Sequence, residues 1–465
     1  MKHPIPLRAR VSRVCVSLFA PLLMLSSLFA QDQPPAEFMQ TFHIVDIKVE
    51  GNKKTRPNVI LREMKTRAGD TVTLEQLELD QKRIASLGLF SRVEMRAEPE
   101  EDGIALIIVV AEQWYIFPLP VFYFNDREFK LKKLTYGAAV AHTNFRGRAE
   151  FFQVAGLLGF NPILSGSYSN PWIFGDARLF MQMNFFVSRF RNKSSEIRDT
   201  KIDENRIGVG FTFGKRLTLH TSLSLGLSYR QLRTSPADST LTLNPSGRDR
   251  LPQAIITLSR DYRDLIFYPT RGSYFRLMLQ KTGFPGNEYI DYGRMTIDIR
   301  KYFALGQQST FGLAFNGNFS RGVVPSYDRV FFGFATRLRS YVTYLTDAKH
   351  RVKASAEVRF PLLPVTYHHL NSGKLGAYGQ NLKFGISGSV FFDAGTLWLQ
   401  NRAGRNDFSD FTTENFGIQT RPDKWLFGYG VGLNFHLPYI HIARLEFAAN
   451  DLGQTEITFD AGVAF

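Results

Sequence analysis

The chain has 465 residues, a formal net charge of +15, 42 phenylalanines and 18 tyrosines. The positive excess is not gathered into a basic motif, so it suits anionic lipid or a cationic pore lining, and no nucleic-acid partner is expected. The only cysteine is Cys15, which excludes disulfides and thiol chemistry from the chain after it.

Residues 1–30 have the pattern of a secretory signal peptide. Cations from Lys2 to Arg13 precede an apolar run over residues 14–29, and the small residue Ala30 comes before a polar stretch. We expect cleavage after Ala30. The alternative, an uncleaved anchor, needs about 20 apolar residues, and this run is shorter. Residues 31–41 are expected to form a short linker.

Residues 42–113 have mixed periodicity that predicts a small α+β domain of the order β-α-α-β-β. Ile44, Ile47 and Val49 indicate a first strand. Two helices are expected over residues 57–65 and 74–87, and two strands over residues 91–97 and 104–110. Such a domain would carry two exposed sheet edges.

Residues 114–465 alternate apolar and polar side chains in sixteen short segments, which predicts a mainly β chain with a 16-stranded antiparallel transmembrane β-barrel. The even number and the many aromatic residues are typical of barrels in a bacterial outer membrane. In the last segment, over residues 456–465, we expect Ile457, Phe459, Val463 and Phe465 to share one face. The segments have their centres near residues 120, 140, 154, 166, 184, 210, 226, 256, 278, 296, 314, 358, 392, 430, 446 and 460.

If the first strand rises from the periplasm, the connections after odd-numbered strands face outward. Most long polar connections then fall on the outer side, over residues 191–205, 234–248, 321–353 and 401–423. The connections 264–272 and 366–383 are exceptions, because this register places them in the periplasm.

Residues 42–113 also resemble a POTRA domain, the polypeptide-transport-associated repeat. The resemblance rests on Ile47-x-Val49-x-Gly51-Asn52, Gly69-Asp70, and Gly88-Leu-Phe90-Ser-x-Val93, followed by an apolar strand that ends at Glu112. It implies turn and core roles for Gly51, Gly69, Gly88 and Phe90.

The remainder resembles the barrel of the outer-membrane assembly superfamily that contains BamA, TamA and the two-partner-secretion translocators. The matching stretches are Asn144-Phe-Arg-Gly147, Tyr168-Ser-Asn-Pro-Trp172, Tyr268-Pro-Thr-Arg-Gly272, Ala356-Glu357-Val-Arg-Phe-Pro361 and Phe392-Asp393-Ala-Gly395. The resemblance implies a non-enzymatic factor that inserts or translocates polypeptides at the outer membrane. Its POTRA domain, in the periplasm, would receive clients by strand addition, and its barrel would deliver them through a lateral seam. Its implied partners are unfolded outer-membrane or exported polypeptides, outer-membrane lipids, and periplasmic chaperones or accessory lipoproteins.

The superfamily has a signature arginine at the tip of a long loop that folds into the barrel. The matching stretch, residues 332–341, places Arg339 at that position, with Ser340 in place of the usual glycine and Tyr341 after it. The resemblance implies that Arg339 pairs with Asp393, with Glu357 nearby, and locks the loop in the lumen. A solvated loop arginine is the alternative.

The resemblance further implies a lateral seam between the first strand, near Pro118 and Pro120, and the last strand, with Phe459 and Phe465. Proline lacks an amide donor, which would weaken pairing there. The alternative is that the prolines only mark the start of the strand.

Catalytic constellations are not found. A P-loop, a nucleophile elbow and a His-x-x-x-His helix are all missing from the sequence, and His368-His369 fits an exposed turn better than a metal site. We therefore expect no enzyme, cofactor or metal. Two further functions stay open: a two-partner-type secretion pore, for which one POTRA domain and a short linker are unusual, and a passive channel.

Overall fold

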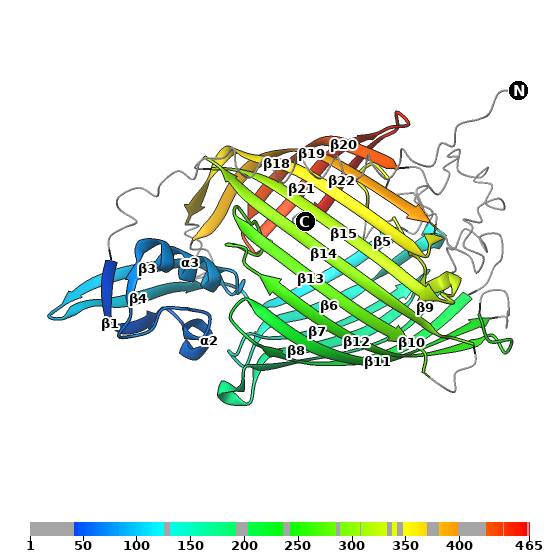
Figure 1. The fold of residues 1–465 in the computed structure, drawn as a ribbon, viewed down its shortest axis with the longest axis horizontal. Coiled ribbons are helices and arrows are strands. Elements are labelled where there is room, and N and C mark those ends of the chain that lie inside the picture. The colour runs from blue at the N-terminus through cyan, green and yellow to red at the C-terminus, as the bar shows by residue number, and fades with distance from the viewer. Residues whose placement is uncertain are drawn as a thin grey trace, which may run out of the picture.

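The structure is a computed structural model that describes residues 41–124, 131–191, 203–235, 242–284, 289–306, 308–332, 337–341, 347–369, 381–398, 425–439, 441–462 and 465. A wide barrel carries a small N-terminal domain at one end, drawn in blue at the left of Figure 1. The expected signal peptide and residues 31–40 of the expected linker lie outside the described residues, and the last linker residue, Thr41, belongs to the first strand.

The N-terminal domain is a four-stranded sheet with two helices. It contains β1 (Thr41–Glu50), α2 (Pro57–Leu61), β2 (Thr71–Thr73), α3 (Leu74–Ala85), β3 (Phe90–Glu100) and β4 (Gly103–Glu112), with the strand order β2-β1-β4-β3. Thr73 caps α3, since its hydroxyl accepts from the amide of Gln76 at 3.3 Å. Ile44, Ile84 and Ile108 are fully buried between the helices and the sheet.

The sequence analysis missed β2, which is only three residues long and pairs with Thr41, Phe42 and His43 of β1. One of the two expected free edges is therefore partly occupied. The strand β3 forms the other edge, and its last five residues are exposed. No helix among the described residues is long and apolar enough to cross a membrane.

Sixteen antiparallel strands form the barrel, as predicted, and every expected centre lies within one of them. In the order of the sheet and of the chain they are β5 (Ile116–Phe124), β6 (Leu134–Phe145), β7 (Glu150–Gly159), β8 (Ile163–Ile173), β9 (Leu179–Arg191), β10 (Asp203–Arg216), β11 (Thr221–Ser235), β12 (Arg248–Asp261), β13 (Gly272–Thr282), β14 (Tyr292–Leu305), β15 (Ser309–Gly322), β18 (His350–His368), β19 (Leu382–Trp398), β20 (Leu426–Leu437), β21 (His441–Asn450) and β22 (Thr455–Ala461). The connection between β15 and β18 adds a two-stranded sheet of β16 (Val330–Phe331) and β17 (Asp347–Ala348). In the described connections lie three short 3-10 helices, η4 (Leu131–Lys133), η5 (Gly175–Ala177) and η7 (Ser326–Asp328).

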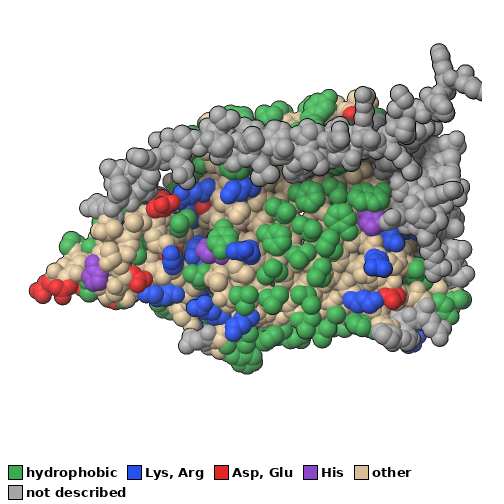
Figure 2. All heavy atoms as spheres, viewed as in Figure 1, with side chains coloured by type: hydrophobic (Ala, Val, Ile, Leu, Met, Phe, Trp, Pro, Cys, Tyr) green, Lys and Arg blue, Asp and Glu red, His purple; other side chains and the backbone are tan. Residues whose placement is uncertain are grey.

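The outward face of the barrel is apolar. On β10, for example, Ile207, Val209, Phe211 and Phe213 are all exposed, while the residues between them face the lumen. Figure 2 shows the same pattern as a green band across the visible wall, with positively charged side chains at both ends. This pattern suits a wall surrounded by lipid.

The strands β5 and β22 are the two ends of the sheet, and among the described residues no ladder joins them. Phe459 on β22 is 70% exposed, whereas Phe465 is 7% exposed and lies inside the barrel. Its ring stacks on Tyr302 with centroids 6.2 Å apart, and its carbonyl accepts from Arg359 at 3.4 Å.

The expectation that Phe465 shares the outward face with Phe459 is therefore wrong. The strand ends at Ala461, and Gly462 follows with a φ of +94°, a conformation that costs glycine nothing. The chain leaves the sheet there, so the alternation no longer determines the direction of later side chains.

Three stretches that carry the family resemblance meet the N-terminal domain. In the first, Asn144 donates to the Thr55 hydroxyl at 2.9 Å and the carbonyl of Gly147 accepts from the Arg56 amide at 2.9 Å. In the second, the ring of Trp172 lies 5.1 Å from the Arg62 guanidinium, and burial lowers the pKa of Arg62 to about 10.

The third stretch follows Asp264, whose carboxylate is buried in the connection between β12 and β13. This carboxylate accepts from the amides of Leu265, Thr270 and Arg271, and Lys82 of α3 lies 3.4 Å away. All these connections follow even-numbered barrel strands, so they share the end that holds the small domain. The polar connection 264–272 is thus explained as a docking surface, while most of 366–383 lies outside the described residues.

We expect Asp264→Ala to loosen this junction. Burial alone would raise the pKa of Asp264. The hydrogen bonds from Thr270 and Arg271 and the charge of Lys82 nevertheless hold this pKa below its usual 3.8. The stabilisation is thus present at neutral pH and is lost only as the pH falls through the folded-state pKa. Leaving the amides unsatisfied costs about 1–3 kcal/mol, so hydrogen exchange of residues 264–271 should accelerate about tenfold or more.

The matched control is Asp291→Ala, because the Asp291 side chain is 73% exposed. Equal acceleration in the control, or none in Asp264→Ala, would contradict this account of the junction.

Candidate functional site

The connection between β15 and β18 turns back into the lumen. Phe332 and Leu338 are fully buried, and together with Tyr341 they pack on Leu397 of β19 and Leu426 of β20. The close fit has a local cause at Gly395, where an added Cβ would lie 2.6 Å from the Phe332 ring. The loop is therefore part of the barrel interior.

Arg339 is the centre of this arrangement and is 3% exposed. Its Nε and Nη2 donate to the two oxygens of Asp393 at 3.0 and 2.7 Å, and its backbone amide donates to the same carboxylate at 3.1 Å. Its Nη1 donates to Glu357 at 2.5 Å and to Glu446 at 3.2 Å. The structure thus brings Arg339, Asp393 and Glu357 together, as the resemblance implied, and adds Glu446.

The guanidinium also lies on the ring of Phe391, 3.6 Å from its centroid. A planar cation gains from the face of an aromatic ring when water is excluded, and the same plane offers its edge donors to carboxylates. Lysine could not satisfy both requirements, because its ammonium has no planar fork.

Three buried carboxylates exceed the charge of one arginine, and further cations balance them. Lys353 lies 3.3 Å from Asp393, Arg359 lies 2.6 Å from Glu357, and Arg444 lies 3.2 Å from Glu446. The site is a network across β18, β19 and β21 rather than a single pair.

The backbone of the tip has its own constraints. Ser340, which stands where the superfamily usually has glycine, keeps the left-handed conformation with a φ of +74°. Such a conformation costs a side-chain-bearing residue about 1–2 kcal/mol. Asn450 donates to the Ser340 carbonyl at 3.3 Å. On the facing strand, Gly428 makes room for the tip, because an added Cβ would lie 2.1 Å from the Arg339 carbonyl oxygen.

The loop also contacts the last hairpin of the barrel. The Tyr341 hydroxyl donates to Asp451 in the turn between β21 and β22. Arg337 lies 3.1 Å from Glu446 and 3.2 Å from Asp460 on β22. Any displacement of β22 would therefore disturb the loop.

Sequence reasoning did not single out Glu446, Arg337, Phe391, Lys353 or Asp460. A signal for Glu446 existed: Arg444 and Glu446 are charged residues at alternate positions of an otherwise apolar segment, which places both on the lumen face. Phe391 offered a similar signal, because it lies two residues before Asp393 and the alternation of a strand places both side chains on one face.

The predicted residues of the N-terminal domain and of β5 are separate from this network. Gly51, Gly69 and Gly88 all have positive φ in the N-terminal domain, and Phe90 is part of its core. At Gly51 an added Cβ would lie 2.0 Å from the Val110 carbonyl oxygen, so no other residue fits. Pro118 and Pro120 lie on β5, opposite Val140 and Ala138 of β6.

Comparison with known families gives two matches. Residues 144–465 match the Omp85 superfamily domain, and residues 42–113 match a POTRA family described as a surface antigen variable number repeat. The chain belongs to the Omp85 superfamily. Its barrel lies in the outer membrane and its POTRA domain in the periplasm, so connections after odd-numbered strands are extracellular.

Individual relatives are more distant. The outer membrane protein assembly factor BamA of Nitratidesulfovibrio vulgaris is 25% identical over 326 residues, which cover 65% of this chain and 38% of the relative. The match therefore spans less than two-fifths of that relative.

Two solved structures show the same fold. The BamA of Haemophilus ducreyi lacking POTRA domains 1–3 matches with a TM-score of 0.53 and 18% identity, covering 91% of this chain and 84% of that one. CdiB from Escherichia coli matches with a TM-score of 0.54 and 11% identity, covering 90% of this chain and 75% of that one.

We expect Arg339→Ala to destabilise the barrel by about 3–5 kcal/mol, because it leaves three buried carboxylates without their central cation. The measurement is the urea midpoint of the purified protein in lipid vesicles. Adding Asp393→Ala should cost less than the sum of the two single changes, since the second removes an uncompensated charge. The control is Arg248→Ala, because Arg248 is exposed. If the free-energy losses of Arg339→Ala and Asp393→Ala were strictly additive in the double variant, that result would argue against the pairing of the two residues.

A second prediction concerns the space at Gly428. Gly428→Ala should push the tip away from β20 and expose the loop, so a cysteine at Leu338 should react with a maleimide at least tenfold faster. The matched control is Gly156→Ala, where an added Cβ meets nothing within 4 Å. Unchanged maleimide reactivity in Gly428→Ala would contradict this prediction, because it would mean that the tip adjusts to the added methyl group while it stays in the lumen.

Proposed function

We propose that this protein is a non-enzymatic factor that inserts or translocates polypeptides at the outer membrane. The observation that carries the proposal is the pair of sheet ends at β5 and β22, which no ladder joins within the described parts of the chain, together with the loop that contacts β22 from inside. The relative from N. vulgaris is an outer membrane protein assembly factor, which supports the same class of function here.

The first step would take place at the POTRA domain. The strand β3 is an edge of its sheet, and residues 96–100 are exposed. An edge offers unpaired amides and carbonyls that bind any extended backbone, so it suits unfolded outer-membrane or exported polypeptides. Periplasmic chaperones or accessory lipoproteins are further partners for this domain.

The second step would use the seam between β5 and β22. The Tyr115 carbonyl accepts from the Thr143 amide at 2.8 Å, which fixes the direction of the alternating groups along β5. By this alternation the backbone groups of residues 117 and 119 point to β6, and those of Pro118 and Pro120 point to the open edge. The prolines thus leave the ladder with β6 intact and remove two donors from the seam.

Contacts between the loop and β22 would hold the seam between β5 and β22 closed. Asp460 on β22 pairs with Arg337 of the loop and, at 3.3 Å, with Arg444 of β21. The C-terminal Phe465 is held by Arg359, which also pairs with Glu357 beside Arg339. Opening the seam at β22 would break these contacts, so loop and seam would act together.

A locked seam tests the proposal. Cysteines at Leu119 on β5 and Phe459 on β22, both exposed, would be joined by a short bis-maleimide in cells that depend on this gene. We expect the locked protein to lose function, measured by quantitative proteomics of the outer membrane and the secreted fraction. A control pair at Val140 and Val154, which face each other on β6 and β7, joins strands that stay paired.

The outcomes separate the functions. Broad loss of outer-membrane β-barrels supports an insertase, and loss of one or a few exported proteins supports a dedicated translocator of the two-partner type. A proteome unchanged both by locking and by depletion would overturn the proposal in favour of a passive channel.

A further inference from the structure

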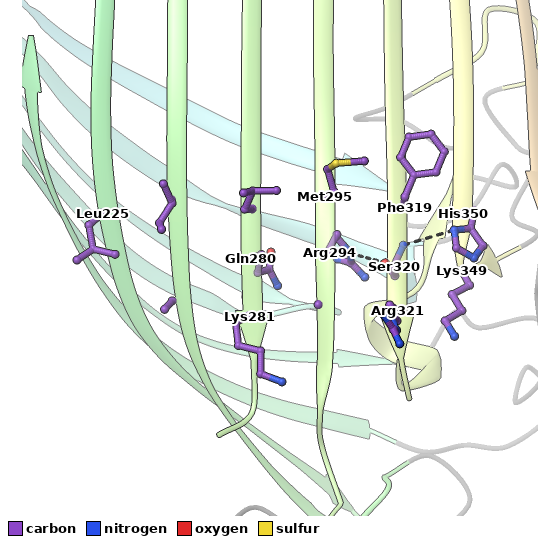
Figure 3. Close-up of a pocket in the computed structure, with 14 residues that line it drawn as sticks. Leu225, Gln280, Lys281, Arg294, Met295, Phe319, Ser320, Arg321, Lys349 and His350 are labelled. Carbon is purple, nitrogen blue, oxygen red and sulfur yellow. Dashed lines mark hydrogen bonds between the residues drawn. The ribbon is translucent and has the colours of Figure 1, made fainter. Parts of the chain in front are cut away.

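A groove of about 790 Å³ lies on the outer wall of the barrel near its extracellular end. Its floor is apolar and crosses five adjacent strands, and its residues are Leu225, Ile256, Leu279, Met295 and Phe319. Figure 3 shows Leu225, Met295 and Phe319 in a row across the strands, with Lys281, Arg321 and Lys349 nearer the strand ends.

These side chains face the membrane rather than the lumen. Leu279 pairs with Ile256 and with Met295, so all three lie on one side of the sheet. Their neighbours Gln280, Arg294 and Ser320 lie on the opposite side, where Arg294 contacts the carbonyl of Asp328 in the extracellular loop. The groove is therefore open to lipid.

Cations stand at the extracellular rim of the groove. Lys281 is the last residue but one of β13, Arg321 the last but one of β15, and Lys349 immediately precedes β18. Lys281 pairs with Asp291, but no described carboxylate pairs with Arg321 or Lys349. Burial and, after it, the charge of Arg329 lower the pKa of the Lys349 amine, so an anion there would relieve an existing repulsion.

A buried histidine in the groove also favours a ligand with polar groups. His350 lines the groove, is 9% exposed, and stacks on Trp398 with centroids 5.2 Å apart. Its Nδ1 lies 3.4 Å from the Ser320 amide, while its Nε2 is buried without a hydrogen-bond partner among the described residues. A buried polar atom of this kind requires a partner.

We propose that the groove binds a multiply phosphorylated, multiply acylated lipid of the outer leaflet, with its phosphates on Arg321, Lys349 and Lys281 and its acyl chains on the apolar floor. Strands are about 4.8 Å apart, so the rim cations from β13 to β18 span about 14 Å and the floor from β11 to β15 about 19 Å. The span of the rim cations favours a ligand with more than one phosphate. The width of the floor exceeds the width that a two-chain phospholipid needs.

The opposite end of the same wall supplies the control. Arg260 on β12 and Lys301 on β14 are also exposed on the lipid face, but they lie toward the periplasm. If these cations only extended into the headgroup region, those at the extracellular end and those at the periplasmic end of the wall would have the same effect on lipid binding.

The test uses the purified full-length protein in detergent micelles, titrated with fluorescent lipid A. We expect the Arg321→Ala/Lys349→Ala variant to raise the dissociation constant at least tenfold, and the Arg321→Lys/Lys349→Arg variant to stay within threefold of the original protein. Arg260→Ala/Lys301→Ala should leave binding unchanged. Heat-modifiable electrophoretic mobility confirms that each variant is folded.

Two results would overturn the proposal. One is equal binding by the two alanine variants, which would reduce the cations to general interfacial residues. The other is equal affinity of the original protein for phosphatidylglycerol or for dephosphorylated lipid A, which would mean that the groove does not recognise several phosphates.

Discussion

The bidentate pair between Arg339 and Asp393 determines how the extracellular half of this barrel is organised. An arginine cannot lose its charge inside a protein, so a loop that carries it into the lumen must find carboxylates there. Those carboxylates come from β18, β19 and β21, and one guanidinium therefore joins three strands and a loop. An apolar contact could stabilise as much, but it would accept many loop positions, whereas a bidentate fork over an aromatic ring accepts one.

The periplasmic end follows a different principle. There the barrel contacts its POTRA domain through short, separate polar contacts at Asn144, Trp172 and Asp264, with a positively charged partner at two of them. Contacts of this kind resemble a transient interface more than a shared core, and domain movement is the default for such junctions. The chain thus combines a tightly paired centre in the lumen with a junction of separate polar contacts, an arrangement that fits the proposed handling of extended clients.

The period-2 alternation was enough to predict all sixteen strands, because each strand separates lipid from the lumen along its whole length. It failed where that separation ends. Phe465, which comes after Gly462, does not follow the alternation and does not face outward. The strand β2 was too short to show any period. In the candidate site, the resemblance supplied Arg339, Asp393 and Glu357, while the place of Glu446 beside them depended on which strands become neighbours in space. Pairing between distant segments is not visible in one sequence, so the sequence showed only three members of the network.

The composition of the Arg339 site also constrains the order of folding. The loop precedes β18, β19 and β21 in the chain, yet its acceptors are carried by those later strands. During synthesis and export the arginine emerges before any of them, and it must remain hydrated until all three have paired. Closing such long-range contacts is slow, because the entropy of a large loop must be lost before the contact forms. Loop docking would then be among the last events of barrel formation, and a barrel stalled before that event would still expose the loop to the cell surface.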